Sequence, residues 1–182
     1  MGVWNHKLPF RAIFTNDATI AAQRLLGCTL SHGSCAGLIT ESEAYRAVGD
    51  PACERFYNAR RQAFAANHPA GTIHLHTTYG RYIMLNVLTK DESGIGFVLI
   101  RSLQPISGLA TMRARRDTDT DRLLCNGPGK LTQALEIEAA NHERSIYEIL
   151  IDRNLATDPL YQARPRIGIS TGTDLLWRYT LV

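Results

Sequence analysis

Residues Leu38 to Glu54 read Leu-Ile-Thr-Glu-Ser-Glu-Ala-Tyr-Arg-Ala-Val-Gly-Asp-Pro-Ala-Cys-Glu, a strand-length segment followed by a Gly-Asp-Pro turn. Side chains alternate along a strand, so Glu41, Glu43 and Tyr45 are expected on one face, together with Ile39. The pattern alone favours a solvated edge strand with exposed acids. The alternative is a buried strand, in which two like charges must be accommodated close together.

Around this segment, helix and strand patterns follow one another without regular alternation. One helix is expected to begin at a cap among Thr15, Asn16 and Asp17 and to end at Gly27, and another begins at Ser107 and includes Met112. Strand patterns occupy residues 28–31, 38–45, 72–77, 81–88, 96–103, 165–170 and 175–181, with a hairpin turn at 78–80. The mixed order predicts an α+β fold and a single domain over residues 1–182.

The composition excludes several classes of protein. With 182 residues, 45% of them hydrophobic, the chain is long enough for one sizeable core. It has no apolar run of membrane-spanning length, and its first ten residues lack the apolar segment of a signal peptide. Its four scattered cysteines form no zinc motif, and His74 and His76 share a strand face without further ligands at a suitable spacing, so no metal is expected.

Two segments carry features of nucleic-acid binding. Residues 55–69 are basic with interleaved aromatic side chains, and are expected to be irregular. The composition leaves open whether they form a nucleic-acid-facing loop or a solvated connection. Residues 126–130, Asn-Gly-Pro-Gly-Lys, form a turn before a helix, and its backbone N–H groups are suited to hold a phosphate. The net charge of +3 suits an anionic partner.

Several separated blocks resemble, in the right order, the alkyladenine (3-methyladenine) DNA glycosylase family. The block from Ile39 to Tyr45 is similar to the family signature Val-Glu-Thr-Glu-Ala-Tyr, and the turn Asp50-Pro51-Ala52 follows it as in the family. Further blocks are Arg24–Gly27, Tyr79–Tyr82 with Asn86, Leu99–Arg101, Leu124–Leu131, Pro165–Ile169 and Trp177–Tyr179. The resemblance covers nearly the whole chain. It implies one domain with a curved antiparallel sheet, surrounding helices and a protruding β-hairpin that inserts into DNA.

The resemblance also implies the reaction, which is hydrolysis of the N-glycosidic bond of alkylated purines in double-stranded DNA. The expected lesions are 3-methyladenine and 7-methylguanine, with hypoxanthine and ethenoadenine as further candidates. A base inside a duplex must be flipped into a pocket, where a carboxylate activates water against the sugar. The expected enzyme is monofunctional, a monomer without metal or cofactor, and cytoplasmic at a bacterial-type nucleoid, with no membrane partner.

Individual positions match the family's functional residues. Glu43 matches the general base, Glu41 a less essential acid, and Arg101 the arginine that helps to hold the water. The base pocket is expected to contain the stacking residue Tyr45, the wall residues Glu54 and His76, and Asn86, which excludes normal guanine. The residues expected to contact DNA are the wedge Tyr79 together with Arg81, Arg60 and Lys130.

Two pocket positions depart from the family pattern. Glu54 stands where the family commonly has histidine, and His76 stands where it has a tyrosine. The altered wall leaves the lesion range open, and it motivates the alternative of a non-catalytic lesion-binding protein of the same fold. Retention of Glu43 and Arg101 speaks against that alternative. A small-molecule or tRNA-directed enzyme on the same scaffold is a further alternative, against which Tyr79 at a hairpin tip speaks.

Overall fold

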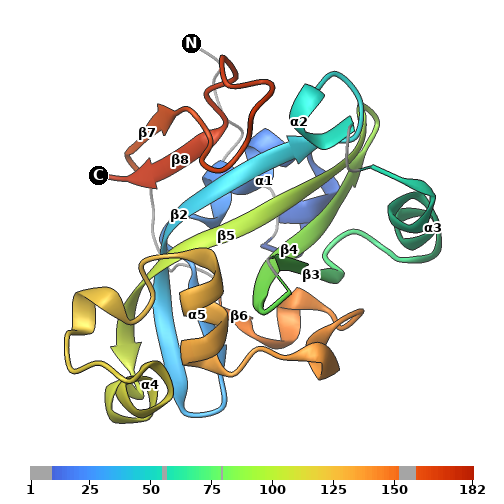
Figure 1. Cartoon of the computed structure of the whole chain (residues 1–182). Coiled ribbons are helices and arrows are strands. Elements are labelled where there is room, and N and C mark those ends of the chain that lie inside the picture. Colours follow the sequence, from blue (N-terminus) through green and yellow to red (C-terminus); the bar gives the residue numbers. More distant parts are fainter. Residues whose placement is uncertain (1–9, 55–56, 79, 152–158) are drawn as a thin grey trace.

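An antiparallel β-sheet forms the centre of the fold (Figure 1). The computed structural model describes residues 10–54, 57–78, 80–151 and 159–182. Their strands follow the order β3-β4-β5-β2-β1-β6, with β8 beside β2 and β7 beside β8. The strands are β1 (Thr29–His32), β2 (Cys35–Arg46), β3 (Ile73–Thr78), β4 (Tyr82–Asp91), β5 (Gly94–Ser107), β6 (Leu150–Ile151), β7 (Tyr161–Arg164) and β8 (Arg178–Leu181). Together with the helices, this sheet confirms the predicted α+β class.

Helices surround the sheet. The α-helices are α1 (Ala18–Leu25), α2 (Pro51–Glu54), α3 (Ala59–Asn67), α4 (Leu109–Arg116) and α5 (Pro128–Leu135), and short 3-10 helices lie at Phe10–Thr15, Asp121–Leu123, Ala139–Asn141 and Ile146–Glu148. Of the three candidate caps, Asp17 caps α1 by accepting a hydrogen bond from the Thr19 amide, and the chain leaves the helix at Gly27 with a φ of 82°, as predicted.

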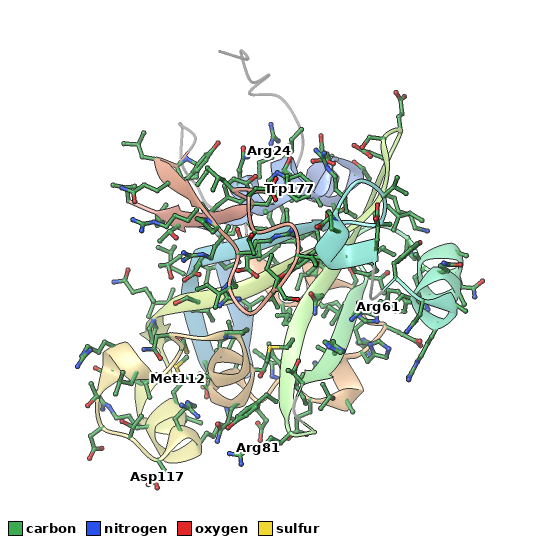
Figure 2. All side chains as sticks on the ribbon, turned by 45° about the horizontal axis from the view of Figure 1, so that its top comes forward. Arg24, Arg61, Arg81, Met112, Asp117 and Trp177 are labelled. Atoms are coloured by element: carbon green, nitrogen blue, oxygen red, sulfur yellow. The ribbon has the colours of Figure 1, made fainter. Side chains whose placement is uncertain are left out.

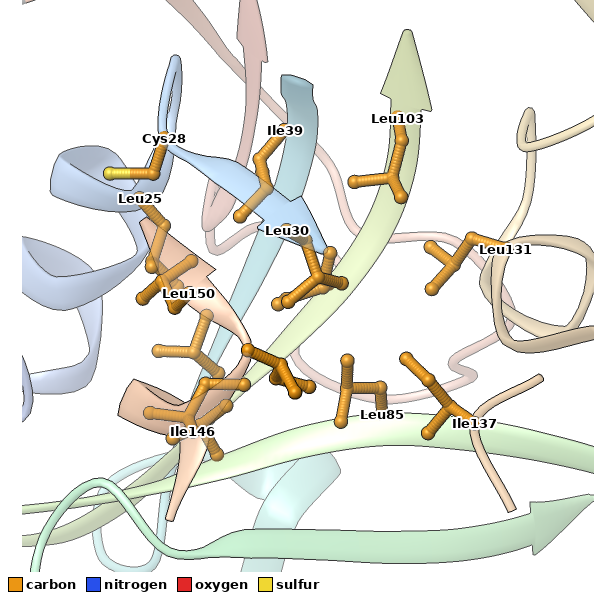
Figure 3. Close-up of a cluster of buried hydrophobic side chains, with 14 of the residues drawn as sticks. Leu25, Cys28, Leu30, Ile39, Leu85, Leu103, Leu131, Ile137, Ile146 and Leu150 are labelled. Atoms are coloured by element: carbon orange, nitrogen blue, oxygen red, sulfur yellow. The ribbon is translucent and has the colours of Figure 1, made fainter. Parts of the chain in front are cut away.

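The main core lies between one face of the sheet and helices α1 and α5. Helix α1 contacts β2 and β5, and α5 contacts β4 and β5. Figure 3 shows the apolar side chains that meet in this layer, among them Leu25, Leu30, Ile39, Leu85 and Leu131, all fully buried. Helices α1 and α5 cover this face of the sheet. The burial of these side chains therefore determines which face of β2 is turned toward the core.

Strand β2 lies inside the sheet, so the interpretation of an exposed edge strand is wrong. It pairs with β5 along one edge, while its other edge pairs first with β1 and then, from Glu41 to Glu43, with β8. The register with β5 shifts on both sides of Glu41. Because of these shifts, Ile39 lies in the main core on the same side as Ser42 and Ala44, whereas simple alternation had placed it with the glutamates.

The opposite face of the sheet carries Glu43 and Tyr45. A second apolar cluster of Phe64, Ala65, Leu88 and Phe97 covers part of this face, with Tyr45 against it. The chain between β7 and β8, drawn in red, passes beside α2 in Figure 1, and the Thr171 hydroxyl donates a hydrogen bond to the Pro51 carbonyl there. The C-terminal segment therefore closes over the end of the sheet that bears the two carboxylates.

Three local predictions are corrected by the structure. Residues 55–69 were expected to be irregular, but they contain α3, which Asn58 caps by accepting a hydrogen bond from the Arg61 amide. Ser107 was expected to cap a helix, but the N-cap position of α4 is occupied by Gly108, which has no side chain to form a capping hydrogen bond. Residues 165–170 were expected to form a strand, but the strand is β7, which ends at Arg164. Arg166 and Ile167 follow it as irregular chain because their polar groups bond to other parts of the fold.

Strands β3 and β4 form the predicted antiparallel hairpin, with Thr78 opposite Tyr82. The predicted wedge Tyr79 lies outside the described residues, and Gly80 follows it with a φ of 70°. No helix in the described ranges is both long and apolar enough to cross a membrane.

Candidate active site

The Glu43 carboxylate is fully buried and held by three hydrogen bonds. Its Oε2 accepts one from the Tyr45 hydroxyl at 2.7 Å and one from Nη1 of Arg101 at 3.1 Å. Its Oε1 accepts one from the Ile167 amide at 2.8 Å. A carboxylate offers about four lone-pair sites, two on each oxygen. The described contacts therefore account for both sites of Oε2 and for one of the two on Oε1.

Two arginines neutralise the paired acids of β2. Nε of Arg101 donates to Glu41 Oε1 at 3.1 Å, so a single guanidinium connects Glu41 and Glu43. Arg178 at the start of β8 donates from Nη1 to the same Glu41 oxygen and from Nε to the Pro165 carbonyl. This answers how β2 accommodates two neighbouring negative charges, since each carboxylate has a cationic partner within hydrogen-bonding distance.

A second buried ion pair supports Tyr45 from one side. Arg166 and Asp50 both have side chains that are 0% exposed, and their two hydrogen bonds measure 2.6 and 2.7 Å. The Arg166 guanidinium lies 4.7 Å from the centre of the Tyr45 ring and 5.3 Å from the centre of the Trp177 ring. Trp177, labelled in Figure 2, lies in the segment just before β8. Arg166 is therefore held between two aromatic rings while its charge is satisfied by Asp50.

A row of residues crosses four strands on the face that carries Glu43. Glu43 on β2 is opposite Leu99 on β5, Leu99 is opposite Asn86 on β4, and Asn86 is opposite His74 on β3. Paired residues of an antiparallel sheet share a face, so Asn86 lies about 10 Å from Glu43, two strand spacings away. His76 belongs to the next row, opposite Met84. The structure thus brings Glu43, Tyr45, Asn86 and His76 to one face of the sheet.

Imidazole and aromatic rings attach α3 to this face. Phe64 of α3 stacks on His68 at 4.6 Å and on His142 at 5.5 Å between ring centres, and it meets the edge of His74 at 4.7 Å. Burial, followed by the positive charge of Arg61, lowers the pKa of His74 to about 4. His76 is exposed on β3, where partial desolvation lowers its pKa. His74 is therefore neutral at physiological pH, as an aromatic cluster of this kind requires.

Glu54 and Arg60 lie at the periphery of this arrangement. The Glu54 carboxylate is exposed and accepts a hydrogen bond from the Gly49 amide at 2.7 Å, at the end of α2. Arg60 is exposed on α3. The Glu54 side chain thus bonds to the turn before α2, and neither residue contacts the Glu43 carboxylate in the described structure.

The remaining predicted DNA contacts lie near the hairpin and the start of α5. Arg81 is exposed beside the hairpin turn, and its guanidinium lies 4.7 Å from the centre of the Tyr82 ring. Nζ of Lys130 donates to Asn126 at 2.8 Å in the turn that leads into α5. Arg81 and Gly129 line the same surface hollow, of about 430 Å³. These positions share one end of the molecule without a direct contact to Glu43.

Sequence reasoning did not assign roles to several residues that complete the site. Asp50, Arg166 and Arg178 occur in blocks that carry the family resemblance, but no local pattern predicts that they pair across more than a hundred positions. The Ile167 amide is a backbone group and leaves no signal in the sequence. A shared signal exists only in the residue types, because a fold that buries the Glu43 and Asp50 carboxylates needs cationic partners for them.

No group of three or more potential metal-ligating side chains was found within the described ranges. The four cysteines are buried and unpaired with one another. The polar groups of the site are thus carboxylates, guanidinium groups, an amide and a phenol, which are suited to acid-base chemistry and to the binding of a polar planar ligand.

Comparisons with known proteins place these features in a family context. A family model described as methylpurine-DNA glycosylase (MPG) matches residues 12–182. The chain is 39% identical over 178 residues to a protein of Prosthecochloris aestuarii, covering 92% of this chain and 85% of that protein. It is 36% identical over 167 residues to one of Chlorobaculum tepidum, covering 87% and 80%. It is 38% identical over 173 residues to one of Rhodopseudomonas palustris, covering 94% and 83%. All three are named "Putative 3-methyladenine DNA glycosylase".

Proposed function

Because the chain belongs to the methylpurine-DNA glycosylase family, we propose that it releases alkylated purines from double-stranded DNA by hydrolysing the N-glycosidic bond. The observation that supports this best is the Glu43 carboxylate, which is held by three donors on the same sheet face as an aromatic wall and an amide. A fixed carboxylate suits both tasks of the reaction, which are removal of a proton from water and stabilisation of a cationic sugar.

In this mechanism, Oε1 of Glu43 takes the proton of the attacking water. The described donors occupy both lone-pair sites of Oε2, whereas Oε1 accepts only the Ile167 amide and keeps one site for the water. The bond from the sugar to the purine breaks as the oxygen of the water attacks the anomeric carbon, and the electron pair leaves with the base. Arg101 keeps the carboxylate ionised and oriented, since it bonds to Glu41 and Glu43 together.

The flipped base occupies the face in front of this carboxylate. Tyr45 stacks on the base, and Arg166 supports its ring from one side. Asn86 stands about two strand spacings from Glu43, where its amide reads the edge of the purine and its bulk excludes the exocyclic amine of guanine. His76 takes part in the stacking wall as a neutral ring, which suits a cationic base.

The duplex lies across the hairpin and the start of α5. Tyr79 enters the minor groove as a wedge and fills the space left by the flipped base. Arg81, Arg60 and Lys130 neutralise phosphates, and the backbone of the turn at 126–130 adds N–H donors. The proposed enzyme acts as a monomer, needs no metal or organic cofactor, and performs no strand-cleaving step because a water rather than a lysine attacks the sugar.

The proposed substrates are 3-methyladenine and 7-methylguanine, whose bases are cationic while attached to the sugar and leave as neutral molecules, with hypoxanthine and ethenoadenine as neutral candidates. Neutral bases depend more on stacking than cationic bases do. Glu54 occupies the position of an aromatic residue of the stacking wall, and its carboxylate accepts a hydrogen bond from the Gly49 amide. The wall therefore offers less stacking area, and we expect cationic lesions to be released faster than neutral ones.

A second candidate function is lesion binding without catalysis. It is favoured by one observation, the complete burial of Glu43, because a base must reach the water that it activates. Incubation of the protein with methylated duplex DNA, followed by chromatography of the free bases, separates the two functions. Release of 3-methyladenine supports the glycosylase, and tight lesion binding without free base supports the binding protein. If the protein neither releases 3-methyladenine nor binds the lesion tightly, the proposed substrate is contradicted.

A further inference from the structure

We propose that Tyr45 is a positioning residue for the general base, and that its hydroxyl group holds the Glu43 carboxylate in its reactive orientation. This role is separate from the stacking of the Tyr45 ring on the base. The inference rests on the proposed function of Glu43 as the residue that activates water. It assigns to one side chain a contact with both the flipped base and the catalytic carboxylate.

The contact that carries this inference is direct and short. The Tyr45 hydroxyl donates to Oε2 of Glu43 at 2.7 Å, which is shorter than the 3.1 Å hydrogen bond from Arg101 to the same oxygen. The two residues are two apart on β2, so both side chains leave the same face of the strand. With Oε2 bound by the phenol and the guanidinium, the carboxylate cannot rotate without losing two hydrogen bonds. Its other oxygen, Oε1, is thereby directed to the position that the water occupies.

The ring that carries this hydroxyl is itself fixed. The fully buried guanidinium of Arg166 covers one side of it at 4.7 Å from the ring centre, and Asp50 holds Arg166 in place through two hydrogen bonds. Rotation of the Tyr45 ring away from Glu43 would expose that buried ion pair or collide with it. Two buried charges, on Asp50 just after β2 and on Arg166 far from it in sequence, thus determine where the phenol points.

The hydroxyl remains a donor at any pH at which the protein works. Burial, and then the neighbouring Glu43 carboxylate, raise the pKa of Tyr45 far above its usual value of about 10. A hydrogen bond from a neutral donor favours the ionised form of a carboxyl group over the protonated form. Loss of the hydroxyl must therefore shift proton uptake by Glu43 to higher pH, which is an effect that stacking alone does not produce.

The test compares wild type with Tyr45→Phe, which removes the hydroxyl and keeps the ring. The measurement is single-turnover excision of 3-methyladenine from duplex DNA between pH 5 and 9, together with the affinity for the lesion duplex. We expect the variant to bind within about threefold of wild type, because the ring still stacks. We expect its rate at pH 7 to fall about tenfold, and the acidic limb of its pH profile to move up by about one unit.

Tyr57→Phe is the matched control, because the Tyr57 ring packs against the same apolar cluster and makes no recorded contact with Glu43 in the described structure. We expect it to retain the wild-type rate and pH profile. A Tyr45→Phe variant whose rate and pH profile equal those of wild type would overturn the inference. So would a variant that loses affinity alone, since Tyr45 would then only stack.

A second readout does not depend on activity. Carbon-13 NMR of the side-chain carboxyl groups, with Glu43 assigned by comparison with Glu43→Gln, follows proton uptake in wild type and in Tyr45→Phe. The inference expects the Glu43 titration to move to higher pH in the variant, and an unmoved titration contradicts it. If wild type releases no base, the proposed function fails. The titration then still decides whether the phenol holds the carboxylate.

Discussion

Three carboxylates and three guanidinium groups meet behind the proposed base pocket. Arg101 bonds to Glu41 and Glu43, Arg178 bonds to Glu41, and Arg166 bonds to Asp50. A buried charge without a partner costs several kcal/mol, so each of these groups depends on the others for its burial. These cationic partners let the fold place the Glu43 carboxylate at a fully buried position.

Glu41→Gln tests the dependence of this network on its shared acid. The amide keeps the shape of Glu41 but removes the charge that Arg101 and Arg178 both contact. We expect the free energy of unfolding in urea to fall by about 1–3 kcal/mol, since two charge-assisted hydrogen bonds are weakened. We expect the excision rate to fall about tenfold because Arg101 is less firmly held, which is far less than the loss on removal of Glu43.

Glu148→Gln is the control for this substitution, because Glu148 pairs with Arg144 on the exposed surface within one turn. Its unfolding curve should coincide with that of wild type, as exposed ion pairs contribute little. If Glu41→Gln were as stable and as active as wild type, the shared-acid role of Glu41 would be refuted.

Helix α3 is joined to the sheet by rings whose charge depends on pH. Neutral His74 lies against Phe64 and Phe97, and its pKa of about 4 is below the ordinary value of 6.5. The unfolded chain therefore takes up this proton first as the pH falls. The stability from a neutral His74 is complete above pH 6.5 and is lost as the pH falls toward 4.

His74→Phe should remove this part of the pH dependence, because phenylalanine keeps an apolar ring and cannot be protonated. Between pH 7 and pH 4.5, urea unfolding should show a loss of stability that is smaller in the variant by about 1–2 kcal/mol, after allowance for the partial exposure of the ring. Equal losses in both proteins would place the pH dependence at other groups.

The β3–β4 hairpin is proposed to act on DNA through its tip. Tyr79→Ser should lower the affinity for a lesion duplex by a few kcal/mol at most, since the flipped state loses the side chain that fills its place. The affinity for undamaged duplex depends on phosphate contacts, and it should fall much less and remain strongly salt-dependent. Titration of labelled duplexes with and without a lesion gives both values.

Tyr82→Ser serves as the control for the hairpin, because Tyr82 is an exposed tyrosine three residues further on, with Arg81 stacked on its ring. We expect it to change both affinities to a similar, small extent. If Tyr79→Ser also changed both affinities to a similar, small extent, Tyr79 would be an ordinary contact to the DNA backbone.

Much of the fold could be predicted from the sequence, because strand alternation, the cap at Asp17 and the hairpin turn are local signals. The irregular register near Glu41 could not. One extra residue in β2 shifts the pairing between β2 and β5, and one extra residue in β5 then shifts it back. Neither strand therefore shows an interruption in its own sequence pattern. Helix α3 was missed because Phe64, which attaches it, finds its partners at His74 and His142.

The candidate site, like the fold, could be predicted only in part from the sequence. Glu43, Arg101 and Tyr45 could be proposed from the family resemblance, and in the structure Arg101 and Tyr45 both bond to Glu43. Their supports could not be proposed, because Arg166 meets Asp50 across 116 positions of the chain and the third donor to Glu43 is a backbone amide. Such contacts follow from tertiary packing and not from any local pattern of residues.

In the proposed function, the molecule as a whole combines a site for one flipped base with a surface for duplex DNA, and these two functions can be separated at Glu43. Glu43→Gln keeps the shape of the side chain but removes the group that accepts the proton. The decisive measurement is single-turnover release of 3-methyladenine from duplex DNA by wild type and by Glu43→Gln, with lesion binding measured in parallel. We predict rapid release by wild type, and release slowed by several orders of magnitude in the variant with lesion binding retained. Release by Glu43→Gln at a rate near that of wild type would contradict the role of Glu43 as the general base.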